Sequence, residues 1–245
     1  MKVPLLLLPG LTGGADCWGA AFLSALKKGG TEPLLYEPPQ DYSFDGAVAS
    51  ASRQIEERGK TCAVLGWSMG ADVALRLALK RPELVSSLVL CSACADQASL
   101  ARRSDVQRRL LNDPWPHWYR LLMQAVMPLS SRARPAAAEN FMRLMTQKAQ
   151  NDALRWNAQR EALKAAPSVM EDLPRLRVPT LVCSGTEDML FPPDEGRKIA
   201  ARMPRARFRL FDAGHAIMYD RPKELAEAVT GFLAERSAER TIEAL

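Results

Sequence analysis

The sequence predicts an α/β fold with a mostly parallel sheet of about six strands and helices on both faces. Short apolar runs alternate with helical stretches along the first 95 residues, and the same alternation resumes after residue 172. An all-helical block separates the two parts. Single helices between strands imply right-handed crossovers, which make neighbouring strands parallel. At 245 residues, the chain is long enough for one domain of this kind.

The elements of the first part follow one another closely. The run Leu5 to Leu8 is entirely apolar and ends at Pro9-Gly10, as expected of a strand buried on both faces. Further strands are expected at 34–37, 61–66 and 85–91, and helices at 17–28, 45–58 and 68–80. Gly29 and Gly59 follow two of these helices, where glycine commonly ends a helix.

Residues 96–172 break the alternation. This block is rich in Arg, Ala, Leu and Met and reads as helical throughout, with proline punctuation. We therefore expect a helical cap or lid inserted into a core made of residues 1–95 and 173–245. Beyond the block, strands are expected at 180–185 and 207–211, and helices at 194–203 and 222–235. The last ten residues are expected to fray.

Composition argues against several classes of function. The net charge of +5 comes from 33 basic and 28 acidic residues, without the dense basic stripe of a nucleic-acid-binding protein. No run approaches the roughly 18 apolar residues that span a membrane. The apolar run at the N-terminus lacks a convincing signal-peptide cleavage site. We therefore expect a cytoplasmic protein that binds neither nucleic acid nor membrane.

The five cysteines are expected to be reduced thiols of the core. Their number is odd, and the chain is large enough not to need disulfides. Cys91 and Cys94 form a C-x-x-C, but no second pair or histidine stands at metal-ligand spacing. We expect neither a metal site nor a cofactor.

The pentapeptide Gly66-Trp67-Ser68-Met69-Gly70 joins a predicted strand to a predicted helix. A serine at such a sharp turn needs glycine two residues before and after it, so that the neighbouring backbones can pass. This geometry lifts the hydroxyl above the sheet edge and directs the first amides of the helix toward it. Ser68 is the candidate nucleophile.

A serine hydroxyl needs a base, and the chain has two histidines. His215 follows the last predicted strand, so it lies at the same sheet edge as Ser68. His117 lies in the helical block, in Pro-Trp-Pro-His-Trp, and is expected to line or cover the site. We assign His215 as the base and keep His117 as the alternative.

The base in turn needs an acid that fixes its tautomer. Asp188 follows the predicted strand 180–185, between the serine and the histidine in chain order. Asp96, after the fourth strand, and Glu187, beside Asp188, are the alternatives. The developing oxyanion needs backbone donors, for which we assign the amides of Leu11 and Met69. The glycines around Leu11 are also compatible with a turn of no function.

Together these motifs resemble the α/β-hydrolase superfamily. The resemblance covers nearly the whole chain in order and rests on Leu8 to Leu11, Gly66 to Gly70, Gly185 to Pro192, Gly214-His215 and Asp220-Arg221-Pro222. Trp18 also stands where the family commonly has an aromatic residue. The resemblance implies an α/β-hydrolase fold and a catalytic triad of Ser68, Asp188 and His215. Two departures are expected: Pro9 replaces the family's usual histidine, and the sheet has six strands rather than eight.

A serine nucleophile implies acyl transfer to water. The expected substrate is a small or medium carboxylic ester, lactone or thioester, cleaved through an acyl-enzyme. The cap resembles that of small-molecule esterases and enol-lactonases, so C–C bond hydrolysis or enol-lactone opening remains an alternative. A ligand-binding or signalling module with little turnover is a third possibility. The protein is expected to be a monomer or homodimer.

Seven side chains are expected to line the substrate pocket: Trp67, Trp118, Met123, Phe141, Met145, Arg143 and Met189. The alternative for the aromatic residues and methionines of the cap is the cap's own core. Seven of the arginines in the cap are considered for the pocket: Arg102, Arg103, Arg108, Arg109, Arg120, Arg143 and Arg155. They form either a solvated face or, if one or two point inward, a site for an anionic acyl group.

Overall fold

The computed structural model describes residues 2–59, 61–126 and 135–243, and some side chains near the two ends of the last range lie outside the description. Its centre is one sheet of the strands β1 (Val3–Leu8), β2 (Thr31–Leu35), β3 (Cys62–Trp67), β4 (Val85–Cys91), β5 (Thr180–Gly185) and β6 (Ala206–Phe211). The order is β2-β1-β3-β4-β5-β6, and every neighbouring pair is parallel. The predicted fold class and the number of strands are confirmed.

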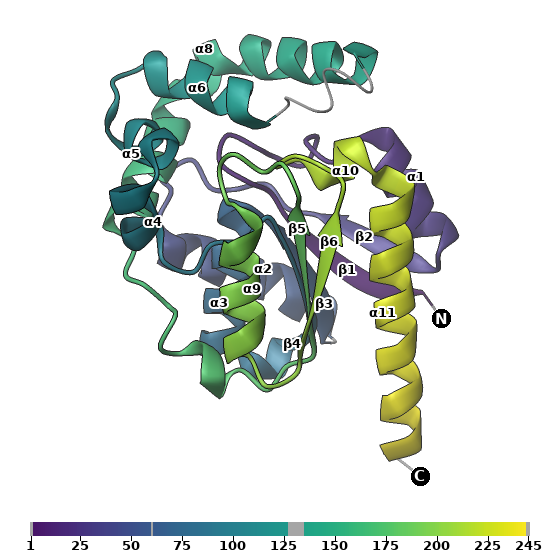
Figure 1. Ribbon diagram of the computed structural model, residues 1–245. Helices are drawn as coiled ribbons and strands as arrows, with labels where there is room; N and C mark the ends of the chain where they lie inside the picture. The colour runs from purple at the N-terminus through teal and green to yellow at the C-terminus, as the bar shows by residue number, and fades with distance from the viewer. Residues whose placement is uncertain (1, 60, 127–134, 244–245) are drawn as a thin grey trace.

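Helices cover both faces of the sheet. They are α1 (Ala20–Lys28), α2 (Phe44–Glu56), α3 (Met69–Lys80), α9 (Pro193–Arg202), α10 (Ile217–Asp220) and α11 (Pro222–Glu243), with short 3₁₀ turns at Pro82–Leu84 and Leu173–Arg175. In Figure 1, α1 and α11 lie on one face, and α2, α3 and α9 on the other. The central strands β1 and β3 are therefore buried on both sides, which explains their continuous apolar sequences.

The strand order reverses between β1 and β3. The chain leaves β1 toward β2 at one edge and then returns to β3 on the other side of β1. The connections after β1 and β3 therefore diverge, which opens a crevice above the carboxyl ends of these strands. In open α/β sheets, ligands bind at such a switch point. The loop 9–14 and Ser68 both lie there.

Between β4 and β5, the described residues form four helices: α4 (Gln97–Arg103), α5 (Asp105–Asn112), α6 (His117–Val126) and α8 (Pro135–Ala165). Figure 1 shows α6 and α8 crossing above the carboxyl end of the sheet, with α4 and α5 beside it. An aromatic cluster joins α6 to α8, in which the rings of Tyr119 and Trp156 stack with centroids 5.2 Å apart. Trp115 and Trp118 complete this cluster.

Two expected elements were placed wrongly. The second strand spans Thr31–Leu35 rather than 34–37, because Gly30 turns at φ 88° and Thr31 pairs at once with Val3. Helix α11 continues to Glu243 instead of fraying after Glu235. Neither glycine nor proline follows in that segment, so nothing ends the helix.

The cysteines are all free and buried. Cys91 and Cys183 face each other in register on β4 and β5. The hydrogen bond with Cys183 and burial raise the pKa of the Cys91 thiol well above its ordinary value, so this thiol is protonated. In the described ranges, neither a metal-binding cluster nor a helix long and apolar enough to cross a membrane is found.

Candidate active site

Ser68 adopts a strained backbone conformation, with φ 57° and ψ −121°, between β3 and α3. The two flanking glycines make this turn possible. A Cβ on Gly66 would lie 2.3 Å from the carbonyl oxygen of Gly70, and one on Gly70 would lie 2.0 Å from the carbonyl oxygen of Leu8. The side chain of any other residue would therefore push the turn away from β1. Ser68 is 8% exposed, so it lies at the rim of the buried region.

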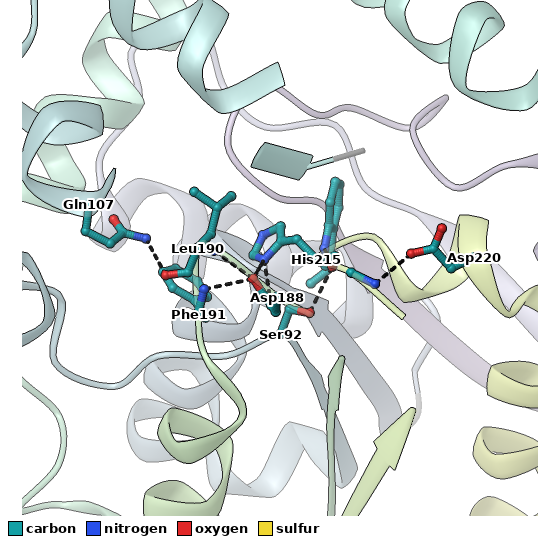
Figure 2. Close-up of polar contacts among 9 residues, drawn as sticks. Ser92, Gln107, Asp188, Leu190, Phe191, His215 and Asp220 are labelled. Carbon is teal, nitrogen blue, oxygen red and sulfur yellow. Dashed lines mark hydrogen bonds and ion pairs between the residues drawn. The ribbon is translucent and has the colours of Figure 1, made fainter. Parts of the chain in front are cut away.

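His215 and Asp188 are in direct contact. The imidazole Nδ1 lies 2.9 Å from each carboxylate oxygen, and both side chains are buried (Figure 2). A carboxylate at Nδ1 fixes the tautomer in which Nε2 accepts a proton. The alternative acids lie elsewhere: Asp96 accepts the amide of Ser99 at the start of α4, and Glu187 is exposed.

The carboxylate of Asp188 is held by its own loop. Its Oδ1 accepts the backbone amides of Leu190 at 2.9 Å and Phe191 at 2.8 Å (Figure 2). Gln107 of α5 donates to the carbonyl of Leu190 at 3.0 Å. The loop after β5 is therefore fixed both from within and from the cap.

His215 is held by contacts that the sequence did not reveal. Its carbonyl oxygen accepts hydrogen bonds from Trp67 Nε1 at 2.9 Å and from Ser92 Oγ at 2.8 Å. Asp220 accepts the preceding amide, that of Gly214, at 2.8 Å (Figure 2). Ser92 lies directly after β4 with φ 48°, so a polar residue at a strand end was the available signal. Asp220 belongs to Asp220-Arg221-Pro222, one of the motifs on which the resemblance to the α/β-hydrolase superfamily rests.

The loop after β1 passes beside Ser68. A Cβ on Gly10 would lie 3.1 Å from the Cβ of Ser68. The next residue, Leu11, is buried, and its amide makes no hydrogen bond within the described part of the chain. Met69 is the first residue of α3, so its amide has no acceptor within the helix. Within the described residues, the N–H groups of both predicted oxyanion donors therefore have no acceptor; Met69 directly follows Ser68, and Leu11 directly follows Gly10.

The geometry can be compared with known proteins. A sequence profile described as "Alpha/beta hydrolase family" matches residues 5–228, which is most of the chain. The chain belongs to the α/β-hydrolase family. It is 28% identical over 247 residues to "Putative carbamate hydrolase RutD" of Stutzerimonas stutzeri, with 95% of this chain and 92% of that protein covered.

Two further proteins similar to this α/β-hydrolase differ in size and in name. "Polyketide synthase ThaQ" of Burkholderia thailandensis is 30% identical over 220 residues, covering 83% of this chain but 10% of that protein. This chain thus spans about a tenth of that relative's length. A thermophilic esterase from Thermogutta terrifontis has the same fold, with a TM-score of 0.78 at 22% identity, covering 96% of this chain and 91% of that chain.

The residues expected to line the substrate pocket of this α/β-hydrolase differ in their burial and in their contacts. Trp67 packs against the ring of His215, with centroids 5.8 Å apart. Trp118 is fully buried in the aromatic cluster and donates to Asn157, which fits the alternative of a cap core. Met123 is also buried in α6, whereas Met189 is 53% exposed.

The remaining candidates for the pocket are Phe141, Arg143 and Met145 of α8. Arg143 is exposed on α8, and the side chains of Phe141 and Met145 lie outside the described residues. His117, the alternative base, is exposed at the first residue of α6. His215 is thus the histidine that the fold brings to the sheet edge.

Of the seven cap arginines, Arg155 is the buried one. Its guanidinium contacts Glu37 at 2.6 Å and Asp152 at 3.1 Å. Two carboxylates therefore neutralise the guanidinium of Arg155. The remaining six arginines are exposed, as expected of a solvated face.

Proposed function

We propose that this protein is a serine hydrolase that cleaves a small or medium carboxylic ester, lactone or thioester through an acyl-enzyme. The main support is the buried contact of His215 Nδ1 with Asp188, at 2.9 Å, on the sheet edge that also carries Ser68. An imidazole held in this way presents Nε2 as a base. The strained serine beside it is the group that such a base activates.

In the acylation step, Ser68 Oγ attacks the substrate carbonyl and its proton passes to His215 Nε2. Asp188 stabilises the resulting imidazolium. The amides of Leu11 and Met69 donate to the oxyanion of the tetrahedral intermediate. When the intermediate collapses, His215 returns the proton to the leaving alcohol or thiol. Water then repeats the sequence and releases the acid, so the reaction requires no cofactor.

The charge distribution of the cap favours an uncharged acyl group. An anionic acyl group would need an unpaired inward cation. Among the described side chains of the cap, the buried Arg155 is paired with two carboxylates, and the partly buried Arg160 bonds Glu161 and two backbone carbonyls. The names of two similar proteins support the general reaction: RutD is named for carbamate hydrolysis, and the Thermogutta protein is an esterase. We propose the same class of acyl transfer here, with a neutral ester as the substrate.

The proposal is tested by labelling the protein with a fluorophosphonate and locating the adduct by mass spectrometry, alongside hydrolysis of p-nitrophenyl esters of graded chain length. We expect one adduct, on Ser68, and ester turnover that Ser68→Ala reduces to a residual 10³- to 10⁴-fold, roughly, above the uncatalysed rate. No adduct on Ser68 in the folded protein would instead favour the ligand-binding module. An adduct without ester turnover would favour the C–C hydrolase or enol-lactonase.

A further inference from the structure

Helix α8 of the cap contacts the segment after β1 at three points. Lys148 pairs with Asp16 at 2.6 Å. Arg155 holds one carboxylate oxygen of Glu37 at 2.6 Å, while the other accepts the amide of Ala15 at 2.8 Å. Spacings of seven and four residues place Lys148, Arg155 and a third residue, Gln159, on one face of the helix.

The third contact, made by Gln159, is the most deeply buried of the three. Gln159 Oε1 accepts the backbone N–H of Thr12 at 3.1 Å, and the two residues are 1% and 2% exposed. Gln159 is a polar side chain on the buried face of a cap helix, and it bonds a backbone amide 147 residues earlier in the chain. A buried amide without an acceptor costs about 1–3 kcal/mol, so this bond decides whether the loop can hold its conformation.

Thr12 stands at a strained position. The amide of Gly13 donates to the carbonyl of Gly10 at 3.0 Å, which closes a β-turn with Leu11 and Thr12 at its centre. Thr12 has φ 67°, and a positive φ at the third residue is the mark of a type II turn, where glycine is the usual residue. For a β-branched residue this conformation is an outlier that costs about 1–3 kcal/mol.

The hydrogen bond to Gln159 is made by the one peptide that differs between the two common forms of this turn. Type I and type II turns differ by a flip of the central peptide, here the one that joins Leu11 to Thr12. The N–H of that peptide is the group that Gln159 binds. If the peptide flips, Thr12 leaves its strained conformation, and the loop loses the hydrogen bond that ties it to α8. The flip itself leaves the φ of Leu11 unchanged. The Leu11 N–H is displaced because the loop, once released from α8, shifts away from Ser68.

We propose that Gln159 is a positioning residue for the oxyanion hole: from α8, it holds the loop after β1, and with it the Leu11 amide, in place beside Ser68. This inference rests on the proposed function, in which the Leu11 amide is an oxyanion donor. If Gln159 has this role, the packing of α8 against the loop after β1 determines how well the tetrahedral intermediate is stabilised. Substrate binding in the ground state does not depend on it.

The test compares Gln159→Met, which keeps the shape but removes the amide acceptor, with Gln159→Glu, which keeps an oxygen acceptor. We expect Gln159→Met to lower kcat by about 10- to 100-fold, less than the loss of a whole oxyanion donor, with KM within about twofold. Binding of an alkyl boronic acid, which mimics the tetrahedral intermediate, should weaken by the same factor. Gln159→Glu should restore most of both losses.

A double variant separates positioning from a general effect on folding. In Thr12→Gly/Gln159→Met, glycine adopts the positive φ at no cost, so the turn no longer needs the glutamine. We expect kcat to recover at least about tenfold over Gln159→Met, within the range set by the lost donor. Asn157→Leu removes another amide from α8, the one that binds Trp118, and should leave kcat within about twofold.

The outcomes separate this inference from the proposed function. A wild-type protein that does not hydrolyse esters contradicts the proposed function. An active wild type with an equally active Gln159→Met contradicts the role of Gln159 alone. A loss of kcat with unchanged boronate affinity, or without recovery in the double variant, also overturns it. Hydrogen exchange of the peptide spanning residues 9–16 should be faster in Gln159→Met, and unchanged exchange would contradict the inference independently of activity.

Discussion

The imidazole of His215 and the carboxylate of Asp188 meet at 2.9 Å in a region that is closed to solvent. Changing Asp188 to Asn should lower kcat by about 10³- to 10⁴-fold, because the amide favours the wrong imidazole tautomer. KM should change little. Steady-state hydrolysis of a p-nitrophenyl ester measures both. Asp96→Asn is the matched control and should keep kcat, since Asp96 caps α4; an equal loss there would mean that the acid was assigned wrongly.

His117→Ala should keep most of the wild-type activity, whereas His215→Ala should lose it. His117 is exposed at the start of α6, while His215 is buried against Asp188. The expected difference in kcat is at least about 10³-fold. Parallel assays of the two variants at one pH give the answer. Comparable losses in both would show that the cap histidine takes part in proton transfer.

Gly70→Ala should destabilise the protein by about 3 kcal/mol or more and reduce activity, because the new Cβ would lie 2.0 Å from the carbonyl oxygen of Leu8. Gly231→Ala in α11 is the matched control. Nothing lies within 4 Å of its Cβ position, so alanine should stabilise the helix by up to about 1 kcal/mol. Urea unfolding measures both, and a Gly70→Ala variant of wild-type stability would contradict the described turn.

Asp72 predicts a specific dependence of stability on pH. Burial raises the pKa of this carboxyl to about 6, although Arg76 opposes the shift. A raised folded-state pKa means that the folded protein holds the proton more tightly than the unfolded chain. The contribution of Asp72 is therefore fully present below its unfolded pKa, about 4, and is lost as pH rises to about 6.

The measurement is the free energy of unfolding of the wild type and of Asp72→Asn at several pH values. Asparagine does not titrate, so the difference between the two proteins should change by about 2 kcal/mol between pH 4 and pH 7, with the wild type gaining toward low pH. Arg58→Gln, which alters an exposed pair with Glu32, should show no such change in this window. A pH-independent difference for Asp72→Asn would rule out the raised pKa.

Most of the fold could be predicted from the sequence because the patterns that specify its strands and turns are local. The apolar run Leu5 to Leu8 can only be a buried strand, and the glycines around Ser68 are required by contacts of about 2 Å that no other residue tolerates. Asp188 and His215 each follow a predicted parallel strand, and this was enough to predict that both lie at the same edge of the sheet. The ends of the strands were harder to predict. Strand β2, for example, begins where its register with β1 allows pairing, which the sequence of β2 alone does not show.

The supporting residues were not predictable, since their partners are distant in the chain and follow no spacing rule. Gln159 lies 147 residues from the amide that it binds, and Ser92 lies 123 residues from the carbonyl of His215. A buried glutamine in a helix and a serine after a strand are both common. Only the packed structure assigns them a partner. The sequence thus proposed the reacting groups, and the structure shows which residues hold His215, Asp188 and the loop after β1 in place.

Ser68 and the residues grouped with it come from the ends of five different strands, with Leu11 after β1, Ser68 after β3, Ser92 after β4, Asp188 after β5 and His215 after β6. No fragment shorter than residues 11–215 contains them all. Under the proposed function, a nascent or partly unfolded molecule that lacks β6 holds the serine without its base and should not cleave esters. The proposed esterase activity would therefore begin only when the last strand has paired, and its onset would time the completion of the sheet during refolding.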